Sequence, residues 1–126
     1  MGKGKKAEVR VGGQLYRLRF DLYALEQVEE EFGGIREAFD KLRGKGMVEA
    51  IRKMFKIMAN SQRDFDGLPA DVTGNEISKH ESMQKLVEIS DAIRAAVDIG
   101  MAAETVNGEA DDETHDAYLE EINAKN

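Results

Sequence analysis

Three consecutive glutamates, Glu29, Glu30 and Glu31, are the densest group of residues in the chain that could bind a metal or transfer protons. They lie in a segment whose apolar spacing predicts a helix. Because consecutive residues on a helix diverge by about 100°, their carboxylates cannot converge on one ion. The sequence therefore predicts a solvated helix face at this position.

Three aspartates in the segment after residue 60, Asp64, Asp66 and Asp71, raise the alternative of calcium binding. The spacing does not fit an EF-hand, because Gly67 follows Asp66 directly and no glutamate stands at the twelfth position of the loop. Pro69 marks the same segment as a loop. We interpret these aspartates as loop and capping residues.

His115, beside Asp112 and Asp116, is the remaining candidate for a metal site. A metal site needs several ligands fixed in geometry, and this stretch offers one histidine in an acidic tail. His80 is isolated. The chain contains no cysteine, no nucleophile paired with a base and no phosphate-binding glycine loop. We expect no catalytic, metal or cofactor site, and a protein that is not an enzyme.

The charge of the chain is concentrated at its C-terminal end. The 126 residues carry a net charge of −7. Residues 102–126 contain eight acids against Lys125, so the first 101 residues balance at zero. A neutral body argues against nucleic-acid binding, and charged residues interrupt every stretch that could span a membrane. We expect one globular domain over residues 7–103, a disordered basic N-terminus over 1–6 and a flexible acidic tail over 104–126.

The first ordered unit is predicted to be a β-hairpin. In "AEVRVGGQLYRLRF" apolar and charged residues alternate on both sides of Gly12 and Gly13, which can take the positive φ angles of a tight turn. A lone hairpin is marginal in water, so helices must cover one face. We expect the hairpin to pack against the first helix through four apolar residues, Leu18, Phe20, Leu25 and Phe32.

Capping residues divide the rest of the chain into about four helices. Asp21 is placed to cap a first helix that presents Leu22, Leu25, Val28 and Phe32 on one face and ends at Gly33. A second amphipathic helix spans residues 35–42, and a third begins at residue 47.

A capping box, Thr73 with Glu76, and a hydrophobic staple, Val72 with Ile77, start the fourth helix. It runs to about residue 103, with a point between residues 78 and 82 where it can break, and a turn follows at Asn107 and Gly108. The predicted fold class is α+β and mainly α-helical, with an N-terminal β-hairpin packed on about four helices and a flexible acidic C-terminal tail.

The third and fourth helices carry more apolar residues than one helix face needs. Methionine fills gaps in ordinary cores, and it also adapts to variable partners. The surplus therefore has two interpretations, which are burial on two sides and a surface for a partner or a second copy. For the second interpretation the candidate partner-binding residues are Met54, Ile57, Met58, Ile89 and Ile99.

The order of elements resembles a known family. "YRLRFDLYALEQVEEEFGGIREAFDKL", a methionine-rich helix and then "LPADVTGNEISK" resemble the small tail assembly chaperones of long-tailed bacteriophages, prophages and gene-transfer agents. The likeness covers about residues 9–102. Its most telling part is a strand leading into Leu-x-x-Leu-Glu-x-x-x-x-x-Phe-Gly, which is matched by Leu22, Leu25, Glu26, Phe32 and Gly33.

The resemblance implies a non-enzymatic protein that binds the tape-measure protein and helps to recruit tail-tube subunits. It would act in the cytoplasm of the bacterial host and leave before the virion is complete. From the apolar surplus we also expect a homo-oligomer. The alternatives are a small structural tail protein, such as a tube or terminator subunit, and an acidic regulatory or DNA-mimic protein.

Overall fold

The computed structural model describes residues 6–109 of the chain. It begins with a two-stranded antiparallel hairpin, β1 (Glu8–Val11) and β2 (Gln14–Arg17), in which Val11 pairs with Gln14. The two turn residues, Gly12 and Gly13, have φ angles of 62° and 85°. Left-handed backbone at both central positions is the geometry of the tight turns that match strand twist, so the predicted hairpin is confirmed.

Two short helices follow the hairpin. In α1 (Leu22–Phe32) the carboxylate of Asp21 accepts a hydrogen bond from the amide of Ala24 at 2.9 Å, and Gly33 ends the helix with a φ of 99°. Both predicted caps are confirmed. The helix buries Ala24 and Val28 most deeply, whereas Leu22 is exposed. The face of α1 that packs on the core is therefore centred on Ala24 and Val28, and it does not include Leu22 as the apolar spacing predicts. Next comes α2 (Ile35–Leu42).

Two long helices and one short helix complete the described chain: α3 (Met47–Phe65), α4 (Asn75–His80) and α5 (Met83–Glu109). The expected break falls between α4 and α5. Before α4, the Glu76 carboxylate accepts from the amides of Thr73 at 3.1 Å and Gly74 at 2.7 Å, which is one half of the predicted capping box. The turn predicted at Asn107 and Gly108 is wrong, because α5 continues through both residues.

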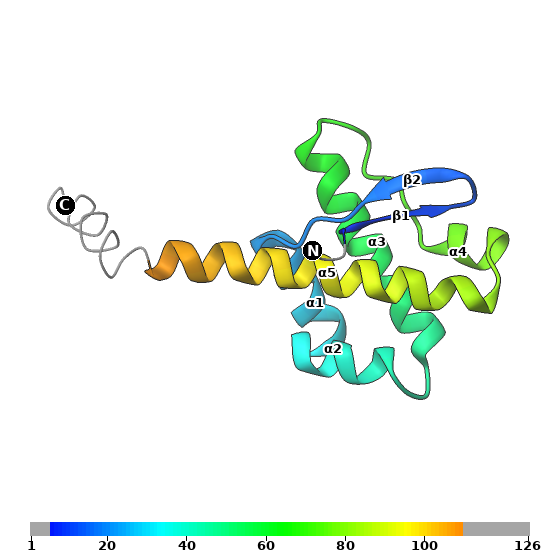
Figure 1. Ribbon diagram of the computed structural model, residues 1–126, viewed down its shortest axis with the longest axis horizontal. Helices are drawn as coiled ribbons and strands as arrows, with labels where there is room; N and C mark the ends of the chain where they lie inside the picture. The colour runs from blue at the N-terminus through cyan, green and yellow to red at the C-terminus, as the bar shows by residue number, and fades with distance from the viewer. Residues whose placement is uncertain (1–5, 110–126) are drawn as a thin grey trace, which may run out of the picture.

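The hairpin packs mainly on α3 and α5, with α4 beside β1, whereas α1 packs on α2 and α3. Figure 1 shows α5 crossing the body next to the hairpin and extending beyond it at its C-terminal end. The two strands therefore contact α3 and α5 more extensively than α1, although the four residues expected at the contact with the first helix, Leu18, Phe20, Leu25 and Phe32, all belong to one core. One anchor of the observed packing is an edge-to-face contact of Tyr16 with Phe55, whose ring centroids are 5.0 Å apart.

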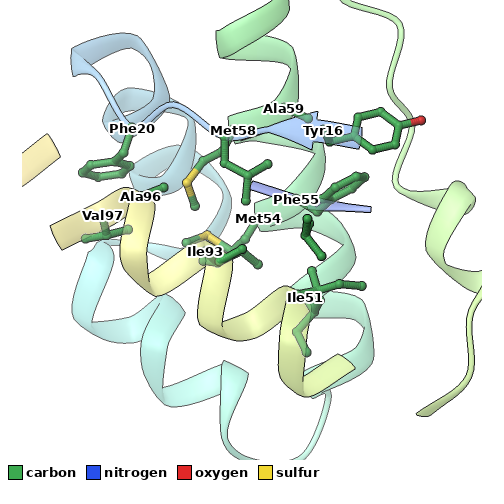
Figure 2. Close-up of a cluster of buried hydrophobic side chains, with 14 of the residues drawn as sticks. Tyr16, Phe20, Ile51, Met54, Phe55, Met58, Ala59, Ile93, Ala96 and Val97 are labelled. Atoms are coloured by element: carbon green, nitrogen blue, oxygen red, sulfur yellow. The ribbon is translucent and has the colours of Figure 1, made fainter. Parts of the chain in front are cut away.

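The core is one cluster with members from both strands and all five helices. Figure 2 shows Met54 and Met58 of α3 directed towards Ile93 of α5, with Phe20 beside Val97. The wide apolar band of α5 is explained by this central position, since the helix contacts both α3 and β1. The predicted class, an α+β and mainly helical fold with an N-terminal hairpin, is confirmed. No helix in the part of the chain that the structure describes is long and apolar enough to cross a membrane.

Candidate functional site

The three consecutive glutamates are exposed on α1. Glu31 forms an ion pair with Lys53 of α3 at 2.6 Å, and Glu49 approaches the same ammonium group at 3.2 Å. Hydrogen bonds to these two carboxylates raise the pKa of Lys53. Glu31 therefore links α1 to α3. The three glutamates lie on an exposed helix face, as the sequence predicts.

The aspartates of the loop after α3 do not converge either. Asp66 accepts hydrogen bonds from the side chain of Gln62, and Asp71 lies 3.6 Å from the Arg63 guanidinium. The ring of His80 lies against the backbone of Gly12. Among residues 6–109 no group of three or more histidines and acids is placed to hold a metal ion. His115, Asp112 and Asp116 lie outside the described residues.

Three of the five candidate partner-binding residues are core residues. Met54, Met58 and Ile89 have no exposed surface. A partner cannot reach them without opening the fold, so their assignment to a binding surface is corrected. The gap-filling role of methionine applies here, because the two thioethers lie between α3 and α5 (Figure 2). Ile57 is half-buried against the core, and only Ile99, with 57% of its surface exposed, is freely accessible.

Ile99 lies on the wall of an apolar groove. The groove has a volume of about 520 Å³ and runs between the start of α1, the segment that joins β2 to α1, and the C-terminal half of α5. Leu22 and Leu25 contribute from α1, and Ile99 and Met101 from α5. Leu22 is 65% exposed and Met101 is also exposed, so the groove is bordered by apolar side chains that face solvent. Contiguous exposed apolar surface of this kind marks interaction sites in soluble proteins.

A close backbone contact brings α5 to the groove. A Cβ atom at residue 100 would overlap the carbonyl oxygen of Phe20 and would lie about 3.0 Å from the Phe20 ring. Gly100 thus lets α5 lie directly against the segment before α1, while Phe20 and Ala96 line the groove beside it. Glycine in a helix interior weakens the helix, and here it permits this approach.

Asp21 anchors the opposite side of the groove. Its carboxylate accepts hydrogen bonds from the Ala24 amide, from the hydroxyl of Ser61 at 2.8 Å and from Nε of Arg19 at 3.0 Å. Burial alone would raise the pKa of Asp21, but these hydrogen bonds and the Arg19 charge outweigh it and hold the pKa below its ordinary value. The carboxylate is therefore a charged structural clamp, which joins α1 to α3 at the edge of the groove.

Arg19 completes this edge. Its backbone amide donates to the carbonyl of Met58 at 3.1 Å, and its guanidinium lies 3.8 Å from the centre of the exposed Phe65 ring. The contact is a cation–π interaction. It holds the segment before α1 against the C-terminal end of α3, so that the groove is formed within the folded chain.

No protein-family model, curated protein or solved structure matches the chain.

Most groove residues carry no local signal that distinguishes them from core residues. Leu22 and Leu25 fit the apolar periodicity of α1, and that periodicity does not show which of them a neighbouring helix covers. One signal does exist in the sequence. Gly100 stands inside a helical pattern with no cap around it, and such a glycine often marks a close backbone approach.

Proposed function

We propose that the protein is a tail assembly chaperone of the long-tailed phage type, whose apolar groove binds an amphipathic helix of the tape-measure protein. The observation that carries the proposal is the groove itself, with exposed Leu22, Ile99 and Met101 along its border. The resemblance of the segment from β2 to α4 supports the same assignment. The groove residues Leu22 and Leu25 belong to the motif on which the resemblance rests.

The chemistry of the groove suits a client helix of loosely defined sequence. An apolar groove binds side chains spaced at i, i+3, i+4 and i+7 of a helix. Binding requires only that these side chains are apolar and of suitable size. Full burial of a leucine or isoleucine side chain stabilises a complex by roughly 1.5–3 kcal/mol. Burial of Leu22 and Ile99 under a client is therefore a substantial part of the binding free energy.

The remaining elements of the proposal follow the family. Recruitment of tail-tube subunits, action in the cytoplasm of the bacterial host and absence from the finished virion are proposed with it, as is a homo-oligomeric free protein. A tail-tube or terminator role is less favoured, because residues 6–109 contain a single two-stranded sheet and ring-forming tail proteins need more strand.

Co-expression with a long helical tape-measure-like protein that aggregates alone tests the proposal. We expect the wild-type chain to keep this client soluble and to co-purify with it. Leu22→Glu and Ile99→Glu should each abolish the rescue, because a carboxylate in the groove must be desolvated when the client docks.

The matched control is Val87→Glu. Val87 is 65% exposed on the same helix as Ile99, and it does not line the groove. It should rescue the client as wild type does. Full rescue by folded Leu22→Glu and Ile99→Glu proteins would show that the groove is not the client site. Failure of the wild-type chain to bind any such client would remove the chaperone assignment.

A further inference from the structure

The groove is an apolar surface that the described residues leave uncovered, and the sequence beyond them contains three large apolar residues. We propose that residues 117–122 of the same chain occupy the groove in the free protein and that a client helix displaces them. The displacement step rests on the proposed function, whereas occupancy by residues 117–122 does not.

The composition of the C-terminal segment singles out these residues. Between residues 110 and 126 the large apolar side chains are Tyr118, Leu119 and Ile122, and the other apolar residues are alanines. Tyr118 and Ile122 are four residues apart, and Leu119 and Ile122 are three apart, so a single helical turn places all three on one face. Such a turn is unstable alone in water, and a groove that buries its apolar face would stabilise it.

The size and charge of the groove fit a short segment. A volume of about 520 Å³ accommodates a few side chains. Of the residues that line the groove, Arg19 and Asp21 carry charge, and they pair with each other at 3.0 Å. The groove is therefore close to neutral, and it would receive the apolar face while Asp116, Glu120 and Glu121 remain in water.

The chain is long enough to return to the groove. Helix α5 ends at Glu109, and Gly100 lies against Phe20 in the groove wall. Nine residues of helix at about 1.5 Å each separate these points by roughly 14 Å. The seven residues from 110 to 116 span up to about 23 Å when extended.

The tether favours this occupant over a second copy. A short flexible linker holds its segment at an effective concentration on the order of millimolar. A second copy at micromolar concentration must compete with that value for the same groove. Even a weakly binding segment of the same chain therefore fills the site first.

A tryptophan reporter tests occupancy in the full-length chain, which contains no tryptophan of its own. In Leu119→Trp we expect a blue-shifted emission and quenching by acrylamide that is several-fold weaker than for the free amino-acid derivative. Addition of Ile99→Glu should restore full quenching, whereas addition of Val87→Glu should leave the indole shielded. Tyr118→Trp is a second reporter and should behave in the same way if the larger ring at position 119 does not fit.

The outcomes separate the alternatives. Full quenching of both reporters in the otherwise wild-type chain, or shielding that persists after Ile99→Glu, overturns the proposal. Shielding that disappears on tenfold dilution assigns the groove to a second copy and overturns it too. Exposed reporters in a chain that still solubilises its client refute this inference alone. Shielded reporters in a chain that binds no client refute the proposed function alone.

Discussion

The side-chain amide of Asn60 makes two hydrogen bonds with the main chain of Val72, one to its carbonyl oxygen and one from its amide, each of 2.9 Å. The asparagine thereby pairs with Val72 as a neighbouring strand would. This contact fixes the loop between α3 and α4 against α3, and Val72 itself is buried.

Replacement of Asn60 by alanine should destabilise the fold by about 2–4 kcal/mol, because two partly buried backbone groups lose their partner at once. Urea unfolding at neutral pH measures the change. The control is Lys56→Ala, an exposed position on the same helix, where the free energy of unfolding should change by less than about 0.5 kcal/mol. Equal stabilities of the two variants would contradict the structural role of Asn60.

Gly100→Ala should lower the melting temperature. Alanine gains about 1 kcal/mol of helix propensity over glycine, but its Cβ overlaps the Phe20 carbonyl and forces α5 away from the groove wall. We expect a net loss of about 1–3 kcal/mol, as for other overpacked sites. Gly44→Ala is the control, since a Cβ there meets one backbone oxygen at an ordinary 3.8 Å. A Gly100→Ala protein more stable than wild type would refute the close contact.

Acid should weaken the clamp at Asp21. The folded-state pKa of this carboxylate lies below its ordinary value of 3.8, so its stabilising effect is fully present above that value and is lost as the pH falls through the folded pKa. Asn retains the capping oxygen but not the charge. The free energy of unfolding of Asp21→Asn, measured in urea, should therefore fall less than that of wild type on acidification from neutral pH to below 3.8. Parallel pH profiles would contradict this role.

A buried and an exposed methionine should differ in their contribution to stability. Met54→Ala should cost about 2–5 kcal/mol, because it removes a fully buried side chain between α3 and α5. Met83→Ala, at a position that is 73% exposed, should change stability by less than about 0.5 kcal/mol. Thermal unfolding followed by circular dichroism checks both. A tolerated Met54→Ala would contradict the burial of this side chain between α3 and α5.

Local signals in the sequence predicted most of the elements. The paired glycines of the hairpin, the cap at Asp21 and the stop at Gly33 each act within a few residues, and each is confirmed. The turn predicted from Asn107 and Gly108 is an exception, because α5 continues through both residues.

The packing was less predictable, because periodicity shows that a residue is apolar but not what covers it. Met54 and Ile99 have the same type of spacing in adjacent helical patterns, yet one is buried and the other is exposed. That difference depends on the path of α5 between the hairpin and α3. The groove depends on the same path, so the apolar spacing that places Leu22 on one face with Leu25 and Val28 does not show that Leu22 borders a groove with Ile99.

The hydrogen bond from the Gly12 amide to the Glu81 carboxylate, 2.6 Å long, joins residues 69 positions apart. During translation at about 5–20 residues per second, the hairpin leaves the ribosome several seconds before α5 is available to cover it. Through that interval β1 lacks α5, one of the helices on which the hairpin packs. A ribosome-bound nascent chain ending at residue 82 is therefore expected to be digested by protease, and one with α5 beyond the exit tunnel to resist digestion.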